Sequence, residues 1–132
     1  MSRYIIDTDT LIDFAMDREP TRTQLLKLIE DGADLGVCAV NVSEFYTGVD
    51  EKRLADWDRF FSALTYWPIT PTAARLAGVN RYTFARAGET LTVSDALVAA
   101  VALVEQATIL TSNGEDYPMP EVTTLSLRDP QA

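Results

Sequence analysis

The chain has 132 residues, a net charge of −9 and no histidine. This length suits one domain with a single buried core, so we expect one domain over residues 1–132. Without histidine, the chain cannot form a Ser-His-Asp triad, a Cys-His triad or a histidine-ligated zinc site. Its single cysteine, Cys38, excludes an internal disulfide and a cysteine-rich zinc site. Any enzymatic chemistry would therefore depend on carboxylates, hydroxyls, arginines or an oxygen-ligated metal.

No segment predicts export or membrane insertion. The N-terminal MSRYIID lacks a positively charged leader followed by a long apolar run. The most apolar stretch, residues 96–104, has about half the length that spans a bilayer and is better explained as a buried helix. Together with the lone cysteine, these features favour a cytoplasmic protein.

The first half of the chain alternates predicted strands with predicted helices. A buried strand over residues 3–7 is expected from its β-branched centre and lack of alternation. The elements that follow are a helix from Asp9 or Thr10 that ends before Glu19-Pro20, a helix over 21–32, a strand over 34–40, a helix over 41–48 and an amphipathic helix over 50–64.

The second half continues the alternation. A short strand over 66–69 precedes Thr70-Pro71, which is a typical helix start and predicts a helix to about Gly88. An apolar helix over 92–107, the TILT strand and a final strand over 122–127 complete the chain. Strands that alternate with helices predict right-handed crossovers, so we expect a three-layer α/β/α sandwich with a mostly parallel central sheet.

Four acidic residues follow predicted strands or begin the helices after them: Asp7, Glu44, Asp95 and Asp116. In a parallel sheet these positions meet at one edge, where function gathers. Each acid taken alone is more simply explained as part of a helix cap, because Glu44, Asp95 and Asp116 each follow a predicted N-cap by three residues. Those N-caps are Asn41, Thr92 and Asn113, and Asp9 can itself cap the first helix. Taken together, the four carboxylates would repel one another unless a divalent cation, such as Mg²⁺, lay between them.

The segment YIIDTDTLID at residues 4–13 also fits a phosphatase of the haloacid dehalogenase type. In that interpretation Asp7 is a nucleophile and Asp9 its acid/base partner, and ILTSN at 109–113 imitates the second motif. That chemistry requires a lysine after the second motif, and the only lysines, Lys27 and Lys52, precede it. The interpretation as a response-regulator receiver domain fails similarly, because such a domain has a lysine at the end of a late strand and this chain has none there. The sequence therefore favours a metal-ligand role for Asp7.

Four segments in order resemble a known family: YIIDTDTLID, VSEFYTG, SDALVAAVAL and TILTSNGEDY. Each is weak alone, but their order and separations are those of PIN-domain ribonucleases, most closely the VapC-type toxins of toxin–antitoxin pairs. The resemblance implies that Asp7, Glu44, Asp95 and Asp116 are catalytic. Asp7, Asp95 and Asp116 would hold Mg²⁺ or Mn²⁺, and Glu44 would complete the shell and orient the attacking water.

The resemblance also implies accessory roles. Asp9 stands where the family most often has Asn, so it is expected to add negative charge without being essential. Thr111 and Asn113 match the last motif of the family and are expected to orient Asp116 or a bound water.

The resemblance implies an RNA substrate and a small VapB-like antitoxin that covers the active-site groove. Phosphate contacts are expected from Arg75, Arg81 and Arg86, which can equally be ordinary solvated arginines. The antitoxin would dock on exposed apolar residues of the first two helices, or on residues 60–61, although all of these can belong to the core. Homodimerisation is usual for the family. The alternatives are a housekeeping PIN nuclease that processes RNA and a PIN-like module that only binds RNA or a partner.

Overall fold

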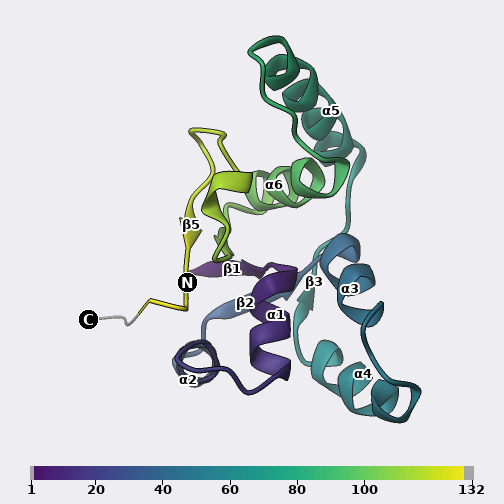
Figure 1. Ribbon diagram of the computed structural model, residues 1–132, viewed down its shortest axis with the longest axis vertical. Helices are drawn as coiled ribbons and strands as arrows, with labels where there is room; N and C mark the ends of the chain where they lie inside the picture. The colour runs from purple at the N-terminus through teal and green to yellow at the C-terminus, as the bar shows by residue number, and fades with distance from the viewer. Residues whose placement is uncertain (1, 130–132) are drawn as a thin grey trace.

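The structure is a computed structural model that describes residues 2–129. Its centre is a sheet in which every strand pairing is parallel, in the order β3-β2-β1-β4-β5 (Figure 1). The strands are β1 Arg3–Ile6, β2 Asp34–Val37, β3 Thr65–Tyr66, β4 Thr108–Leu110 and β5 Thr124–Leu125. The predicted parallel sheet is confirmed. Residue 1 and residues 130–132, the ends of the predicted 1–132 domain, lie outside the described residues.

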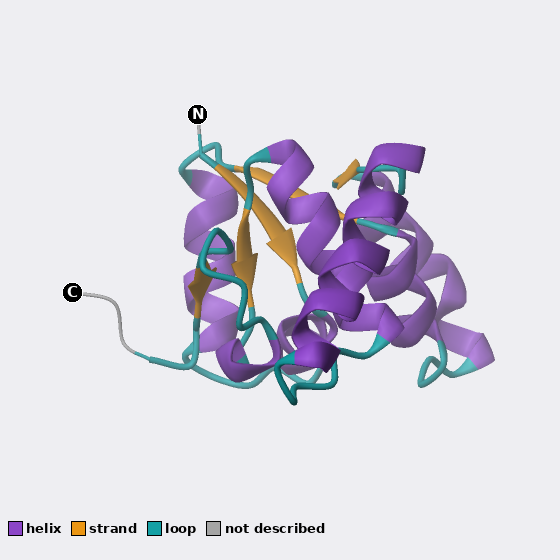
Figure 2. Cartoon of the chain, turned by 90° about the horizontal axis from the view of Figure 1, so that it is seen from above, coloured by secondary structure: helices purple, strands orange, loops and turns teal. Residues whose placement is uncertain are grey.

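Successive residues of the central strands face opposite sides of the sheet, which divides the core in two. Ile5 and Ile109 face one side and pack with α5 (Pro71–Arg86) and α6 (Val93–Glu105). Ile6 and Leu110 face the other side and pack with the remaining α-helices. Those helices are α1 Thr8–Ala15, α2 Thr21–Glu30, α3 Ala39–Tyr46 and α4 Leu54–Ser62. Helices thus lie on both sides of the sheet (Figure 1; the same chain is seen from above in Figure 2), and the predicted three-layer sandwich is confirmed.

Two helix starts that place functional residues are set by local hydrogen bonds. The Thr70 hydroxyl accepts from the Ala73 amide at 3.1 Å, and Pro71 occupies the first helical turn of α5. The Thr92 hydroxyl accepts from the Asp95 amide, also at 3.1 Å, and fixes the start of α6. A threonine oxygen satisfies an amide that has no partner inside the helix, and this is why both starts are readable from sequence.

Several boundaries differ from the prediction. The second strand ends at Val37 instead of residue 40, because Cys38 serves as the N-cap of α3 and the helix begins at Ala39. The predicted helix over 50–64 starts with a 3₁₀ turn, η1 (Glu51–Arg53), before α4. The first helix starts at Thr8, earlier than predicted, because Asp7 and not Asp9 is its N-cap.

The apolar helix α6 is the most deeply buried helix of the fold. Ala96 and the run from Val98 to Ala102 are each at most 2% exposed. These residues lie against the sheet under α5, as expected for a buried core helix (Figure 1). Within residues 2–129, no helix combines the length and the apolarity needed to cross a membrane.

Candidate active site

Asp7 ends β1 and caps α1, and neutral donors hold its carboxylate from two sides. Oδ1 accepts from the Thr8 amide at 2.9 Å and from Asn41 Nδ2 at 3.3 Å. Oδ2 accepts from the Tyr117 hydroxyl at 2.7 Å. No lysine or arginine neutralises this carboxylate among residues 2–129. The site therefore fixes the orientation of Asp7 without cancelling its charge.

Burial raises the pKa of Asp7, and the negative charge of Asp9 raises it further. Hydrogen bonds from Tyr117, Thr8 and Thr111 oppose this shift without overcoming it. The ionised form of Asp7 is therefore held at a cost, which a cation would reduce.

Asn41 is a buried residue that supports Asp7 from within α3. Its side chain is fully buried and accepts from the Cys38 amide at 3.3 Å while its Nδ2 donates to Asp7. Asn41 is thus the third residue of α3 and forms a capping box with Cys38. The prediction that Asn41 is the N-cap is wrong, because Cys38 holds that position. A polar side chain inside the otherwise apolar CAVNV segment was the signal for this buried support.

Asp9 faces the loop that follows β4. Its Oδ2 accepts from the Ser112 amide at 2.8 Å, from the Ser112 hydroxyl and from Asn113 Nδ2 at 3.2 Å, and the Thr111 hydroxyl lies at 3.4 Å. Its Oδ1 accepts from the Thr10 amide at 2.8 Å. Asp9 therefore anchors this loop, a role that the sequence did not reveal.

Thr111 and Asn113 contact Asp9 with their side chains, whereas the sequence led us to expect that they orient Asp116 or water. Asn113 does help to place Asp116 through its backbone, because its carbonyl accepts from the Asp116 amide at 3.0 Å in the 3₁₀ turn η2 (Gly114–Asp116). The hydrogen bonds from the loop to Asp9, together with the backbone bond from Asp116 to Asn113, thus connect the first and last acidic segments of the site.

Asp95 and Glu44 are placed by the helices on the two sides of the sheet. Asp95 lies in the first turn of α6, and Glu44 lies in the last turn of α3. The Thr8 hydroxyl donates to Glu44 Oε1 at 2.8 Å, which brings α3 against the residue next to Asp7.

Electrostatic coupling shows that the four predicted acids share one region. Burial raises the pKa of Asp95, a hydrogen bond from Thr92 opposes the shift, and the charges of Asp116 and Glu44 raise it again. Burial also raises the pKa of Tyr117, and the nearby carboxylates Asp7, Asp95 and Asp9 add to this. The tyrosine therefore stays protonated and donates its hydrogen bond at every physiological pH.

The donor set suits a hard divalent cation, because the converging side chains offer oxygen atoms only. Within the described part of the chain, no three acidic or thiol side chains already stand at the spacing of a formed metal site. Glu44 and Asp116 are exposed, so their side chains can turn toward Asp7 and Asp95 without repacking the core.

The family model of the PIN domain matches residues 4–122 and includes all four acidic positions. The chain belongs to the PIN-domain family. Ribonuclease VapC19 of Mycobacterium tuberculosis is similar to it, with 32% identity over 117 residues that cover 87% of this chain and 92% of the relative. The resemblance found in the four sequence segments is thereby confirmed.

Solved structures show the same PIN fold. VapBC2 from Rickettsia felis bound to a promoter DNA fragment aligns with a TM-score of 0.81 and 18% identity, covering 94% of this chain and 98% of the other. VapBC-1 from nontypeable Haemophilus influenzae aligns with a TM-score of 0.82 and 14% identity, covering 96% and 99%. At these identities the alignments establish the shared fold, whereas the chemistry of the site depends on its own side chains.

Two residues of this PIN-domain site were missed from sequence. Tyr117 follows Asp116 directly and is 4% exposed, yet in the sequence it is one aromatic residue in a loop. Ser112 lies between the two recognised positions Thr111 and Asn113 and supplies two donors to Asp9. Both contacts join residues about a hundred positions apart, and no local pattern encodes them.

Proposed function

We propose that this PIN-domain protein is a metal-dependent endoribonuclease and the toxin of a type II toxin–antitoxin pair. The observation that supports the proposal is the electrostatic and hydrogen-bond linkage among the four predicted acids: the charges of Glu44 and Asp116 act on Asp95, and Tyr117, which donates to Asp7, also lies near Asp95. The similarity to a protein named Ribonuclease VapC19 supports the reaction class.

Asp7, Asp95 and Asp116 would hold Mg²⁺ or Mn²⁺, directly or through water. When bound, the cation lowers the pKa of a water molecule and offsets charge that develops on the phosphate. Tyr117 and Asn41 keep the Asp7 carboxylate oriented, and the Thr8 hydroxyl keeps Glu44 near the reacting water. Water adds to phosphorus and the bond to the 3′ oxygen breaks, so the products carry 5′-phosphate and 3′-hydroxyl ends.

The partner proposed for this site is a VapB-like antitoxin, in keeping with the VapBC complexes among the structural neighbours. A groove of about 360 Å³ lies beside the site and includes Glu44 itself, with Ile12, Met16 and Trp57 in its walls. Ile12 and Met16 are 40% and 61% exposed, as expected for a docking surface on the first helix. Phe60 and Phe61 pack into the core instead, which favours the core interpretation for those two residues.

The test is cleavage of RNA by the purified full-length chain with Mg²⁺ or Mn²⁺, compared with Asp7→Asn and Asp95→Asn. The proposal expects cleavage by the native chain, end groups as above, and no cleavage by either variant. If both variants cleave like the native chain after contaminating nucleases are excluded, the site is wrong. If the native chain binds Mn²⁺ and RNA without cleaving, the non-catalytic alternative is favoured.

A separate measurement tests the toxin assignment. Co-expression with the product of a neighbouring short reading frame should yield a stable complex that no longer cleaves RNA. An active nuclease without such a partner would favour the housekeeping alternative. Homodimerisation stays a prediction from the family.

A further inference from the structure

Helix α5 carries more positive charge than any other helix or strand in the described part of this acidic protein. The chain has a net charge of −9, yet Pro71–Arg86 contains three arginines and no acidic residue. Six of the nine arginines pair with carboxylates: Arg3, Arg18, Arg22, Arg53, Arg59 and Arg128. The other three, Arg75, Arg81 and Arg86, form no ion pair with any residue between 2 and 129. All three therefore keep their charge available for a ligand.

The outer face of α5 combines this charge with an exposed aromatic ring. Arg75, Val79, Tyr82 and Arg86 recur at helical spacing and are all exposed, with Tyr82 at 64%. The guanidinium of Arg86 lies 5.0 Å from the centre of the Tyr82 ring. At a rise of about 1.5 Å per residue, Arg75 and Arg86 stand about 16 Å apart along the helix, which spans a few nucleotides of extended RNA.

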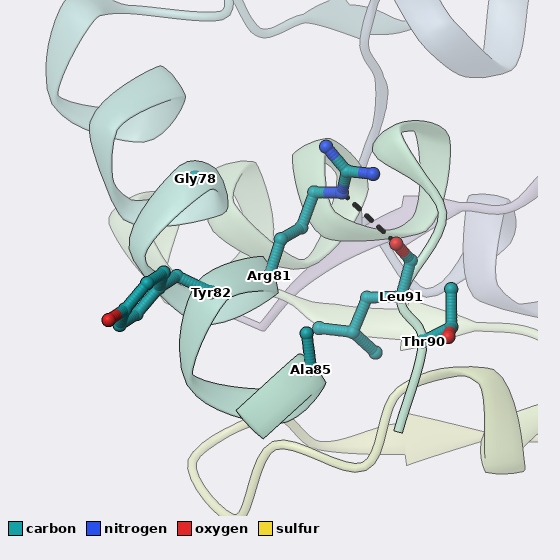
Figure 3. Close-up of a pocket in the computed structure, with 6 residues that line it drawn as sticks. All are labelled: Gly78, Arg81, Tyr82, Ala85, Thr90 and Leu91. Carbon is teal, nitrogen blue, oxygen red and sulfur yellow. Dashed lines mark hydrogen bonds between the residues drawn. The ribbon is translucent and has the colours of Figure 1, made fainter. Parts of the chain in front are cut away.

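A cavity of about 340 Å³ lies beside this face, next to the loop that precedes α6. Its walls are Gly78, Arg81, Tyr82, Ala85, Thr90 and Leu91 (Figure 3). Arg81 reaches from α5 across to the following loop, where its Nε donates to the Leu91 carbonyl at 3.0 Å. The next residue, Thr92, caps α6, whose first turn carries Asp95. The cationic face and the carboxylates are thus joined by one short loop.

We propose that α5 and the loop over residues 87–91 form a binding surface for single-stranded RNA, on which Tyr82 stacks a base and Arg75, Arg81 and Arg86 contact phosphates. This inference rests on the proposed nuclease function, and it explains how an acidic protein can bind a polyanionic substrate. Arg86 covers part of the Tyr82 ring and pre-orders it for a base. Because none of these arginines pairs with a carboxylate among residues 2–129, a phosphate would not have to displace an existing ion pair.

The test measures binding of a fluorescein-labelled single-stranded RNA of about 12 nucleotides by anisotropy, with Asp95→Asn present in every variant to prevent cleavage. Tyr82→Leu should weaken binding about 5- to 100-fold, because leucine keeps apolar bulk but offers no ring to a base. Arg86→Gln should reduce the slope of log affinity against log salt by about 0.7, the value for one lost contact with single-stranded nucleic acid.

The matched controls are Tyr66→Leu and Arg59→Gln, which remove an exposed ring and an exposed charge from other parts of the surface. Both should leave RNA affinity and its salt dependence unchanged. Equal losses in control and α5 variants would overturn the proposal, as would unchanged binding in the α5 variants.

Light scattering on the same samples separates RNA from a protein partner. If Tyr82→Leu lowers the molecular mass of the free protein without changing RNA affinity, the α5 face joins two copies of the chain and the proposal is wrong. Cleavage by the chain with native Asp95 is assayed in parallel. If this chain cleaves RNA and the α5 variants bind RNA as well as the chain with a native α5, only this inference is wrong. If the chain neither cleaves nor binds RNA, the proposed function is wrong as well.

Discussion

The Tyr117 hydroxyl donates to Asp7 Oδ2 at 2.7 Å, across 110 positions of the chain. Tyr117 directly follows Asp116, so this bond ties the last acidic segment of the site to the first. A buried donor that stays protonated stabilises the carboxylate and sets its direction. Tyr117 is therefore a positioning residue for Asp7.

Replacing Tyr117 by Phe tests this role. The ring should keep its buried place while Asp7 loses one hydrogen bond, so we expect a loss of about 1.5–3 kcal/mol in unfolding free energy. RNA cleavage should fall in kcat with little change in KM, and Mn²⁺ affinity measured by calorimetry should change too. The control is Tyr46→Phe, which removes a similar bond of 2.6 Å to Asp58, an acid outside the predicted quartet. If both variants behave alike in Mn²⁺ binding, Tyr117 has only a structural role.

Mn²⁺ should raise the melting temperature of the native chain. A ligand that binds only the folded state at about 100 times its dissociation constant adds about 2.7 kcal/mol of stability. Asp7→Asn and Asp95→Asn should lose most of this gain, and cleavage should fall on the order of 10³-fold or more. Differential scanning calorimetry with and without Mn²⁺ provides the measurement. An undiminished metal shift in both variants would show that the cation binds elsewhere.

The metal-free protein should respond to pH through Asp95. Its pKa is raised in the folded state, so its contribution to stability is full below the unfolded pKa near 3.8 and is lost as pH rises through the higher folded pKa. Asp95→Asn removes this loss. Relative to the native chain, the variant should therefore gain stability as pH rises from about 4 toward neutrality, measured by urea unfolding in EDTA. A constant difference across this range would contradict the raised pKa.

Asp13 should produce the opposite dependence. It is 3% exposed, and although burial alone would raise its pKa, hydrogen bonds from Arg128 and Arg18 lower it. This stability is present above the unfolded pKa and is lost as pH falls through the folded one. Arg128→Gln should cost about 1.5–3 kcal/mol at pH 7 and much less near pH 2. Arg53→Gln, which breaks an exposed ion pair, should cost about 0–1 kcal/mol.

Asp9 should contribute to stability and cleavage by accepting hydrogen bonds from the loop after β4, and not by its negative charge. Asp9→Ala leaves the Ser112 amide and the Asn113 side chain without their acceptor, and we expect a loss of about 1–3 kcal/mol together with reduced cleavage. Asp9→Asn keeps one acceptor oxygen and should retain more of both. Urea unfolding and initial cleavage rates measure the two effects. Equal activity in Asp9→Ala and the native chain would show that the anchor is dispensable.

The sequence by itself determined the order of the elements and the positions of the acids. Threonine caps at Thr70 and Thr92 act within three residues, and buried strands are recognised from runs of apolar side chains. Parallel strands then place Asp7 and Asp116 at the same edge of the sheet, because all carboxyl ends point the same way, whereas Glu44 and Asp95 are carried by helices α3 and α6.

Only the tertiary structure decided which side chains support these acids. Asn41 and Tyr117 reach Asp7, and Ser112 and Asn113 reach Asp9, from segments 34 to 110 positions away. A hydrogen bond of this kind depends on how strands and helices pack in three dimensions, so the periodicity of the local sequence does not predict it. For the same physical reason, the sequence could name the three arginines of α5, but only the folded chain showed that they alone among the nine lack a carboxylate partner within residues 2–129.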